Sequence, residues 1–339
     1  MEELNQLGKI KASLGVGPMS SESIEAAFRY SHYHRKELML IASKNQVDYK
    51  GGYVNGWTTS QFSQYVKELK KIYNNSNVKI CRDHCGPGFN GNYDLRDTYE
   101  TIKADIENDF DLIHIDFCHF KGTKEDRLEE SKKAIKYALG LNPNILLEIG
   151  TDENLGANYS IPNLAEIEKE VDYFKSFCNP EFYVVQTGSL VKEINQKGNF
   201  NRDFVSQISQ LIKSKGIKLK EHNGDYLDKE SIGLRKGIVG AINIAPQLGV
   251  VQTQVTLNKC LIYGVNFDEF LKQSYESKKW EKWLMENGLE NKMLCSVISG
   301  HYNFNTDSYK KIILELGERE DFRESLINNL IEIIHHYEQ

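Results

Sequence analysis

Short runs of apolar, often β-branched residues alternate with longer amphipathic stretches along most of the chain. The apolar runs predict eight strands, at Lys11–Val16, Leu38–Ala42, Val78–Cys81, Leu112–Ile115, Ile145–Glu148, Phe182–Val185, Ile217–Lys220 and Gly240–Ile244. Most of the segments between them have helical spacing, which predicts helices at Ser21–Tyr33, Ser60–Tyr73, Lys124–Leu139, Ala165–Phe177 and Phe204–Lys215. This alternation indicates right-handed βαβ units and a parallel sheet.

Polar residues capable of chemistry follow nearly every predicted strand. They are Asp83 and His84, Asp116, Glu148, Gln186, Glu221 and His222, and Asn243. In a closed barrel these strand ends meet at one mouth, whereas in an open doubly wound sheet they are spread along an edge. Eight units with polar ends therefore favour an α/β fold of the (β/α)8 TIM-barrel type, although alternation alone also fits a doubly wound sheet.

After Pro246 the pattern changes to helices without clear strands, at Asn266–Asn287 and Asp307–Tyr337. We predict a barrel over residues 1–265 and a helical extension over residues 266–339 that packs on it. Trp280 and Trp283 have helical spacing among charged residues, which is more typical of packing than of ligand binding. The glycine-rich pieces Gly51–Gly56 and Gly86–Gly91 follow strands, where barrels form their substrate contacts.

Composition narrows the class of protein. The chain has 339 residues, of which 40% are hydrophobic, and a net charge of −6, so it can form a full core but has no basic field to attract nucleic acid. It lacks an apolar run long enough for a membrane span, and its start does not resemble a signal peptide. Six widely spaced cysteines predict reduced thiols. We therefore expect a cytoplasmic protein without a membrane or nucleic-acid partner.

The usual signatures of several enzyme classes do not occur. The chain has no Walker A pattern and no GxSxG elbow. Gly15-Val16-Gly17-Pro18 lacks the third glycine of a dinucleotide fingerprint. The sequence therefore contains no signature that supports a nucleotide-dependent or serine-hydrolase function.

The strongest local signal is Arg82-Asp83-His84-Cys85-Gly86-Pro87-Gly88, directly after a predicted strand. His84 can offer a ring nitrogen to a divalent metal, while Asp83 beside it can accept a proton. An equally plausible alternative is a turn in which Asp83 caps the next helix and His84 is only half buried.

Two further strand ends carry candidate metal ligands. Alternation directs His114 and Asp116 to the same side of their strand, so Asp116 is a candidate ligand or orienting group, or is held by a neighbouring Lys or Arg. Glu148 ends an apolar strand, and Asp152 and Glu153 after it fit ordinary loop charges.

At the seventh strand only one of the adjacent pair Glu221 and His222 can face the mouth, and we predict His222. Histidines and carboxylates from separate strands suit a divalent cation such as zinc or manganese. We expect His32, His34, His335 and His336 to pack in helices, whereas His301 fits either role.

The ordered pieces of the chain resemble one known family. Ser43-Lys44-Asn45-Gln46-Val47, Gly51-Gly52-Tyr53, Asp83-His84-Cys85-Gly86-Pro87, His114-Ile115-Asp116, Ile149-Gly150-Thr151, Val185-Gln186-Thr187-Gly188 and His222-Asn223-Gly224-Asp225-Tyr226 look like the GatZ/KbaZ-type tagatose-bisphosphate aldolase subunits. The resemblance runs from about residue 10 to about residue 305. That family is related more distantly to the class II, metal-dependent aldolases, which are (β/α)8 barrels.

The resemblance implies a role for each matching residue. Asp83 resembles the aldolase acid/base, and His84, His222, Asp116 and Glu148 resemble metal ligands. Substrate-binding roles are implied for Asn45, Gln46, Gln186, Gly188, Asn243 and Asp225.

The chain also departs from the true aldolases. No histidine follows Gly188 where they place a third metal imidazole, so Gln186, Glu148 or Asp116 would have to complete the metal shell. Asn243-Ile244-Ala245-Pro246-Gln247 lacks the Asp-Thr pair that helps to hold a phosphate.

The resemblance leaves three functions open. One is an aldolase-like lyase that cleaves C3–C4 of a ketose or ketose phosphate, and another is a ketose-phosphate C4-epimerase; both need a divalent metal, with zinc or manganese as the candidates. The third is a non-catalytic subunit that stabilises a separate aldolase chain. The expected partners are a sugar or sugar phosphate and either copies of this chain or an aldolase subunit. A barrel enzyme of unrelated chemistry is a further alternative.

Overall fold

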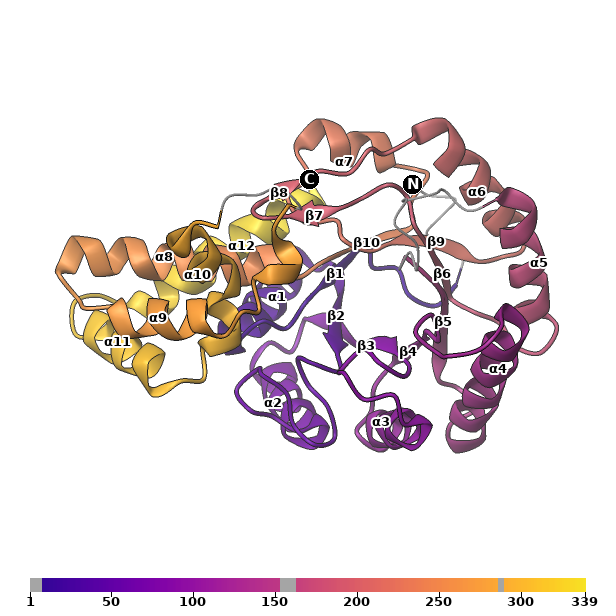
Figure 1. Cartoon of the computed structure of the whole chain (residues 1–339), viewed down its shortest axis with the longest axis horizontal. Helices are drawn as coiled ribbons and strands as arrows, with labels where there is room; N and C mark the ends of the chain where they lie inside the picture. The colour runs from indigo at the N-terminus through magenta and orange to yellow at the C-terminus, as the bar shows by residue number, and fades with distance from the viewer. Residues whose placement is uncertain (1–7, 153–162, 286–289) are drawn as a thin grey trace.

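The computed structural model describes residues 8–152, 163–285 and 290–339, and it contains a closed barrel of eight parallel strands (Figure 1). Around the barrel the strands run in the order β1-β10-β9-β6-β5-β4-β3-β2. Their bounds are β1 Leu14–Val16, β2 Glu37–Ser43, β3 Asn77–Cys85, β4 Leu112–Ile115, β5 Leu146–Thr151, β6 Phe182–Val185, β9 Lys218–Glu221 and β10 Ala241–Ile244. Each predicted strand thus overlaps an observed one, and the doubly wound alternative is excluded.

Helices cover the outside of the barrel (Figure 1). They are α1 Ser21–His34, α2 Thr59–Ile72, α3 Leu95–Glu107, α4 Lys124–Leu141, α5 Leu164–Lys175, α6 Arg202–Ser214, α7 Lys229–Arg235 and α8 Pro246–Tyr263. Ser20, Thr58 and Thr123 cap α1, α2 and α4 by accepting a backbone N–H three residues further on, which fixes where these helices begin. α3 and α7 were not predicted, because their sequences are rich in polar residues.

The interior of the barrel is apolar at mid-height and charged at its two ends. Residues such as Met39, Ile41 and Phe182 form one buried cluster there. At the amino end of the strands the Glu181 carboxylate accepts the backbone N–H of Ile10 at 2.9 Å and pairs with Lys218 at 2.9 Å. These contacts close the lower end, so the open end of the barrel is the one at which the strands finish.

The C-terminal part of the chain forms a helical extension beside the barrel (Figure 1). It consists of α9 Asp268–Glu276, η2 Glu281–Trp283, α10 Lys292–Ser299, η3 Gly300–Asn303, α11 Asp307–Gly317 and α12 Phe322–Glu338. α12 packs on α1 and α8, and an apolar cluster joins α8 to α9, α10 and α11. The domain boundary at residue 265 stays a prediction.

Two helices expected in the extension are interrupted. The predicted Asn266–Asn287 helix ends at Glu276 and is followed by the short turn η2, and its last residues, 286 and 287, lie outside the described residues. The predicted Asp307–Tyr337 helix is broken between Gly317 and Phe322, where Asp321 caps α12. Apolar spacing continues across both breaks, which is why periodicity alone did not place them.

A small antiparallel pair, β7 Val191–Lys192 and β8 Asn195–Gln196, lies outside the barrel after β6. All six cysteines are buried and free, as predicted. Within the described ranges, no helix has the combined length and apolar character that crossing a membrane requires.

Candidate active site

A cavity of about 320 Å³ opens at the carboxyl ends of the strands, where barrel enzymes bind their substrates. Seven of the residues predicted for the site line it: Asn45, Gln46, Asp83, His84, His222, Asp225 and Asn243. Glu148 and Asp116 lie directly behind the two lining histidines, whereas Gln186 and Gly188 are not among the lining residues.

Asp83 and His84 both reach the cavity because the backbone of β3 bends between them. His84 has a φ of 47°, in the left-handed region that non-glycine residues rarely adopt. The pairing of β3 with β4 shifts register between Arg82 and Cys85. Such an irregularity redirects side chains at a strand end, so two consecutive residues can point into one mouth.

The strand β9 delivers His222 through simple alternation. Lys218 and Lys220 point into the barrel, where Lys218 contacts Glu181 and Lys220 contacts Glu148. His222 continues this inward column two residues later. Glu221 points outward instead and pairs with Arg235 at 2.6 Å, so of this adjacent pair it is His222 that faces the mouth.

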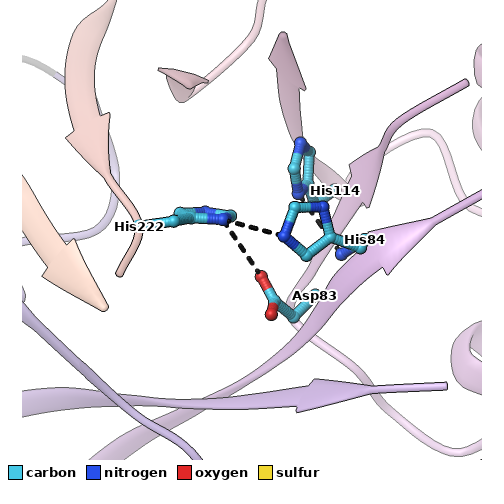
Figure 2. Close-up of side chains that lie close together, drawn as sticks. All are labelled: Asp83, His84, His114 and His222. Carbon is cyan, nitrogen blue, oxygen red and sulfur yellow. Dashed lines mark hydrogen bonds and ion pairs between the residues drawn. The ribbon is translucent and has the colours of Figure 1, made fainter. Parts of the chain in front are cut away.

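Three imidazole rings and one carboxylate meet at the centre of the site. His84 Nε2 and His222 Nδ1 lie 3.1 Å apart, and Asp83 Oδ1 lies 3.7 Å from His222 Nδ1 (Figure 2). The third ring belongs to His114, whose centroid lies 5.0 Å from that of His84 and 5.2 Å from that of His222. One potential ligand atom from each of these four residues lies within 4.8 Å of the others.

Hydrogen bonds behind the rings fix which nitrogens face the centre. His84 Nδ1 donates to Asp116 Oδ2 at 2.9 Å, so the other ring nitrogen, Nε2, faces the centre of the site. The same carboxylate also accepts the Thr151 hydroxyl at 2.9 Å and the backbone N–H of Cys118 at 3.0 Å. With its oxygens so engaged, Asp116 is placed to orient His84, as carboxylates behind metal-binding histidines commonly do.

Glu148 holds His222 in the same way. His222 Nε2 donates to Glu148 Oε1 at 2.9 Å, and the ammonium of Lys220 donates to Glu148 Oε2 at 2.6 Å. Burial raises the pKa of the Glu148 carboxyl, but the charge of Lys220 outweighs burial and the pKa lies below its ordinary value. Glu148 therefore stays ionised and directs His222 Nδ1 towards the centre of the site.

His114 is held as a neutral ring. Its Nε2 donates to the backbone carbonyl of Gly150 at 2.9 Å, and its Nδ1 accepts the backbone N–H of His84 at 3.3 Å. Burial lowers the pKa of this imidazole. An unprotonated imidazole nitrogen has one lone pair, so a metal bound at His114 Nδ1 would replace the long hydrogen bond from the His84 N–H.

Asp152 adds a further carboxylate oxygen to the site. Its Oδ1 is buried and accepts no hydrogen bond in the described part of the chain, yet it lies 3.6 Å from His84 Nε2 and 3.5 Å from His222 Nδ1. Burial lowers the pKa of His222, but Asp83 and the neighbouring carboxylates outweigh it and raise the pKa to about 9. The surroundings thus favour a positive charge at this point, and the donor set fits a divalent cation.

The predicted substrate-binding residues fall into two groups. Asn45, Gln46, Asn243 and Asp225 line the cavity, and Asn243 Nδ2 lies 3.5 Å from Asp83 Oδ1. Gln186 instead braces the loop behind the site, where its side chain donates to the carbonyl of Asp152 at 3.2 Å and accepts the N–H of Gly188 at 2.7 Å.

Sequence reasoning did not select several residues that line or complete the site. His114 was placed on the same strand face as Asp116 but was not chosen as a ligand, and Asp152 was taken for an ordinary loop charge; Glu153 lies outside the described residues. Lys282, Trp283, His301 and Tyr302 of the extension also line the cavity. For His114 the signal was strand alternation. Among the extension residues, Trp283 was assigned to packing and His301 was left open, because contact with the barrel depends on the tertiary fold.

Comparison with known families supports the resemblance seen in the sequence. Residues 2–139 match the sequence model of a family described as D-tagatose-1,6-bisphosphate aldolase subunit GatZ/KbaZ-like. The matched part includes Asp83, His84, His114 and Asp116. The resemblance is confirmed over these residues, and its continuation to about residue 305 stays a prediction.

Solved structures show the same fold over nearly the whole chain. A probable tagatose 6 phosphate kinase from Sinorhizobium meliloti 1021 is 14% identical, with a TM-score of 0.81 over 96% of this chain and 99% of that one. The YdjI aldolase from Escherichia coli K12 is 12% identical, with a TM-score of 0.56 over 92% and 93% of the two chains. Fructose-bisphosphate aldolase from Campylobacter jejuni is 14% identical, with a TM-score of 0.57 over 92% of each chain.

Proposed function

We propose that this chain carries out retro-aldol and aldol chemistry at the C3–C4 bond of a ketose or ketose phosphate, with a divalent cation held by His84, His114 and His222. The observation that carries the proposal is the convergence of these three imidazoles and Asp83 within 4.8 Å. Three imidazoles form a typical catalytic zinc site, which leaves a position open for substrate. The family match to an aldolase subunit over residues 2–139 supports the same chemistry.

The chain's own residues divide the work around the cation. A cation bound here would polarise the ketose carbonyl and stabilise the negative charge that develops on its oxygen. Asp83 accepts the proton of the C4 hydroxyl as the C3–C4 bond breaks, and it returns the proton when the bond forms again. The side chain of Asp83 is 15% exposed and faces the cavity, so a substrate hydroxyl can reach it. Asp116 and Glu148 keep His84 and His222 in position.

The fate of the aldehyde fragment distinguishes the two enzymatic outcomes. If the aldehyde leaves the cavity and the enediolate takes up a proton at C3, the enzyme is a lyase of the class II aldolase type. If it rotates and is recaptured, the product is the C4 epimer of the ketose. The same base and cation serve both outcomes, so we propose this chemistry as the shared core. A cytoplasmic location remains a prediction from the sequence.

Replacement of Asp83 by Asn tests the proposal. Asn keeps the size of the side chain but cannot accept the hydroxyl proton. We expect the purified Asp83→Asn protein to keep its fold and its metal content and to lose turnover by at least about 100-fold, the scale of general-base catalysis. Turnover is followed by NMR on a panel of ketose phosphates, which separates cleavage products from epimers. Metal content is measured by elemental analysis.

Asp109→Asn is the matched control, because Asp109 is an aspartate whose side chain is 72% exposed and pairs with a surface lysine, Lys67. It should keep full turnover. If Asp83→Asn turns over as fast as the unmodified protein, Asp83 is not the base. If the unmodified protein also holds no metal, the cation assignment falls as well.

The family description names an aldolase subunit, and this favours a second candidate function. In that case the chain would be a silent partner that stabilises a separate class II aldolase chain. Purified alone, it would convert no ketose phosphate, but when added to a class II tagatose-bisphosphate aldolase it would raise that enzyme's activity or lifetime. The Asp83→Asn variant separates the two functions, because a silent partner keeps its stabilising effect when Asp83 is replaced.

A further inference from the structure

The loop between β3 and α3 covers one face of the His84 ring. The ring of Phe89, in this loop, stacks on the His84 imidazole, with the ring centroids 4.7 Å apart and an angle of 26° between the planes. Phe89 also lines the cavity. Asp116 determines which nitrogen of His84 faces the centre, because it accepts the hydrogen bond from Nδ1. The plane of the ring depends in addition on where Phe89 lies.

Two amide side chains hold the loop at Phe89. Asn45, from the loop after β2, donates its Nδ2 to the carbonyl oxygen of Phe89 at 2.7 Å. Asn90, the next residue along the chain, donates its Nδ2 to Asp97 Oδ2 at 3.0 Å. Asn90 Oδ1 accepts the backbone N–H of Asn92 at 3.0 Å, which orients this amide. The position of Phe89 is thus fixed by contacts with Asn45 and, through Asn90, with Asp97.

Asp97 lies in the first turn of α3 and is buried where three segments of the chain meet. Its side chain is 3% exposed and pairs with the fully buried ammonium of Lys44 at 2.7 Å. Asp97 Oδ1 also accepts the Tyr49 hydroxyl at 2.8 Å and Lys50 Nζ at 3.3 Å. Burial raises the pKa of the Asp97 carboxyl, but the hydrogen bonds that it accepts, that of Lys44 first, outweigh burial and the pKa lies below its ordinary value. Asp97 therefore stays ionised and can hold all of its donors.

The ion pair between Lys44 and Asp97 also holds the loop after β2 against α3. Lys44 directly follows β2 and precedes Asn45, which lines the cavity and binds the carbonyl of Phe89. Asp97 is therefore connected to Phe89 in two ways, through Asn90 and through the segment of Lys44.

We propose that Asp97 is a positioning residue for the candidate metal site: it holds the loop that keeps Phe89 on the His84 ring, so that His84 Nε2 stays directed at the cation. This inference rests on the proposed function, because it assigns support to a ligand of that cation. Asp97 is not among the residues that line the cavity. Its effect on cation binding is therefore indirect and passes through Phe89.

Replacement of Asp97 by Asn tests the inference. Asn keeps the size of the side chain, but one of its two polar atoms becomes a donor, so it cannot accept from both Lys44 and Asn90 as the carboxylate does. We expect the zinc affinity of the full chain, measured by competition with a chelating dye, to fall about tenfold, the scale seen for residues behind a metal ligand. Glu100→Gln, at an exposed acidic residue three positions later in α3, is the control and should leave the zinc affinity unchanged. Unchanged zinc affinity in Asp97→Asn would overturn the inference.

A double variant separates positioning from stability and from charge. Lys44→Met/Asp97→Leu replaces the buried ion pair by apolar side chains of similar size and leaves the net charge of the protein unchanged. Such replacements often preserve stability, whereas Asp97→Asn leaves a buried ammonium without its counter-charge. We expect the double variant to keep its midpoint of urea denaturation and to lose zinc affinity about tenfold, because Asn90 has lost its acceptor. Normal zinc affinity in this variant contradicts the inference even if Asp97→Asn does not fold.

Phe89→Leu tests the route by which Asp97 acts. This variant removes the stacked ring, so we expect its zinc affinity to fall by a factor similar to that of Asp97→Asn. When the two changes are combined, the second should add little, because no stacked ring remains to be held. Losses that multiply would show that Asp97 does not act through Phe89, and would overturn the inference.

These measurements need no sugar, so they stand apart from turnover. If the unmodified protein binds zinc but neither cleaves nor epimerises a ketose phosphate, the proposed chemistry fails and the role of Asp97 can still be measured. If the protein is active and both Asp97→Asn and Lys44→Met/Asp97→Leu bind zinc normally, the chemistry is retained and the positioning role is rejected. An unmodified protein that binds no zinc would contradict both the cation and the role of Asp97.

Discussion

His84 Nε2 and His222 Nδ1 lie 3.1 Å apart, although their strands, β3 and β9, are not neighbours in the barrel. Each ring directs this nitrogen towards the centre of the site, because a carboxylate on its far side accepts a hydrogen bond from the other ring nitrogen. Two imidazole nitrogens directed at each other need a proton or a cation between them. Asp152 Oδ1 lies within 3.6 Å of both nitrogens, so its charge favours a positive charge between them, whether a proton or a divalent cation.

We predict that His114 is a metal ligand, although it was not selected from the sequence. Loss of a residue behind a metal ligand typically costs 10–100-fold in affinity, so loss of a ligand should cost more than about 100-fold. His114→Asn should therefore lower zinc affinity by at least that factor, as measured by competition with a chelating dye. His34→Asn, an exposed histidine in α1, is the control. Unchanged zinc affinity in His114→Asn would show that His84, His222 and a carboxylate suffice.

The position of His114 explains why part of the site could be predicted and part could not. Strand positions follow from apolar runs, so the ends of the strands and the mouth of the barrel were predictable. Alternation also placed His114 correctly on its strand face. Alternation does not show depth: His114 is fully buried, and its Nδ1 accepts the backbone N–H of His84.

The positive φ of His84 is a second feature that we could not predict from the sequence. A regular strand would send Asp83 and His84 to opposite faces. Both face the mouth because β3 shifts register here and His84 adopts a left-handed conformation, which the pattern of a strand does not predict. The contribution of Lys282 and Tyr302 to the lining could not be predicted for another reason, since it depends on how the extension packs against the barrel.

The chain just after β3 approaches the segment after β4 closely at Gly86. A Cβ atom added there would lie 1.6 Å from the carbonyl oxygen of Asp116, so β3 and the segment after β4 could not approach as closely. We expect Gly86→Ala to lower the free energy of unfolding by more than about 2 kcal/mol, the scale of overpacking a buried position. The measurement is chemical denaturation followed by circular dichroism.

Gly140→Ala is the control for that change. Gly140 lies in α4, has no atom within 4 Å of an added Cβ, and does not have a positive φ. Because alanine is the better helix former, this variant should be as stable as the unmodified protein or up to about 1 kcal/mol more stable. Equal stability of the two variants would contradict the close approach at Gly86.

The free energy of unfolding should depend on pH partly through the titration of Asp225. Burial raises the pKa of this carboxyl from 3.8 to about 7, although the N–H groups of Gln247 and Ala245 lower it in part. The folded state therefore binds this proton more tightly than the unfolded state does, so the contribution of Asp225 to stability falls as the pH rises from about 4 to about 7. Asn at this position cannot titrate. The stability of Asp225→Asn relative to the unmodified protein should thus increase over this range, by up to about 4 kcal/mol.

Urea denaturation of the two proteins at several pH values between 4 and 8 gives this difference directly, because the other titrating groups are common to both. A difference that stays constant with pH would mean that Asp225 titrates normally and is more solvated than its contacts with α8 indicate. A difference that decreases with pH would mean that the ionised carboxylate is stabilised at the amino end of α8.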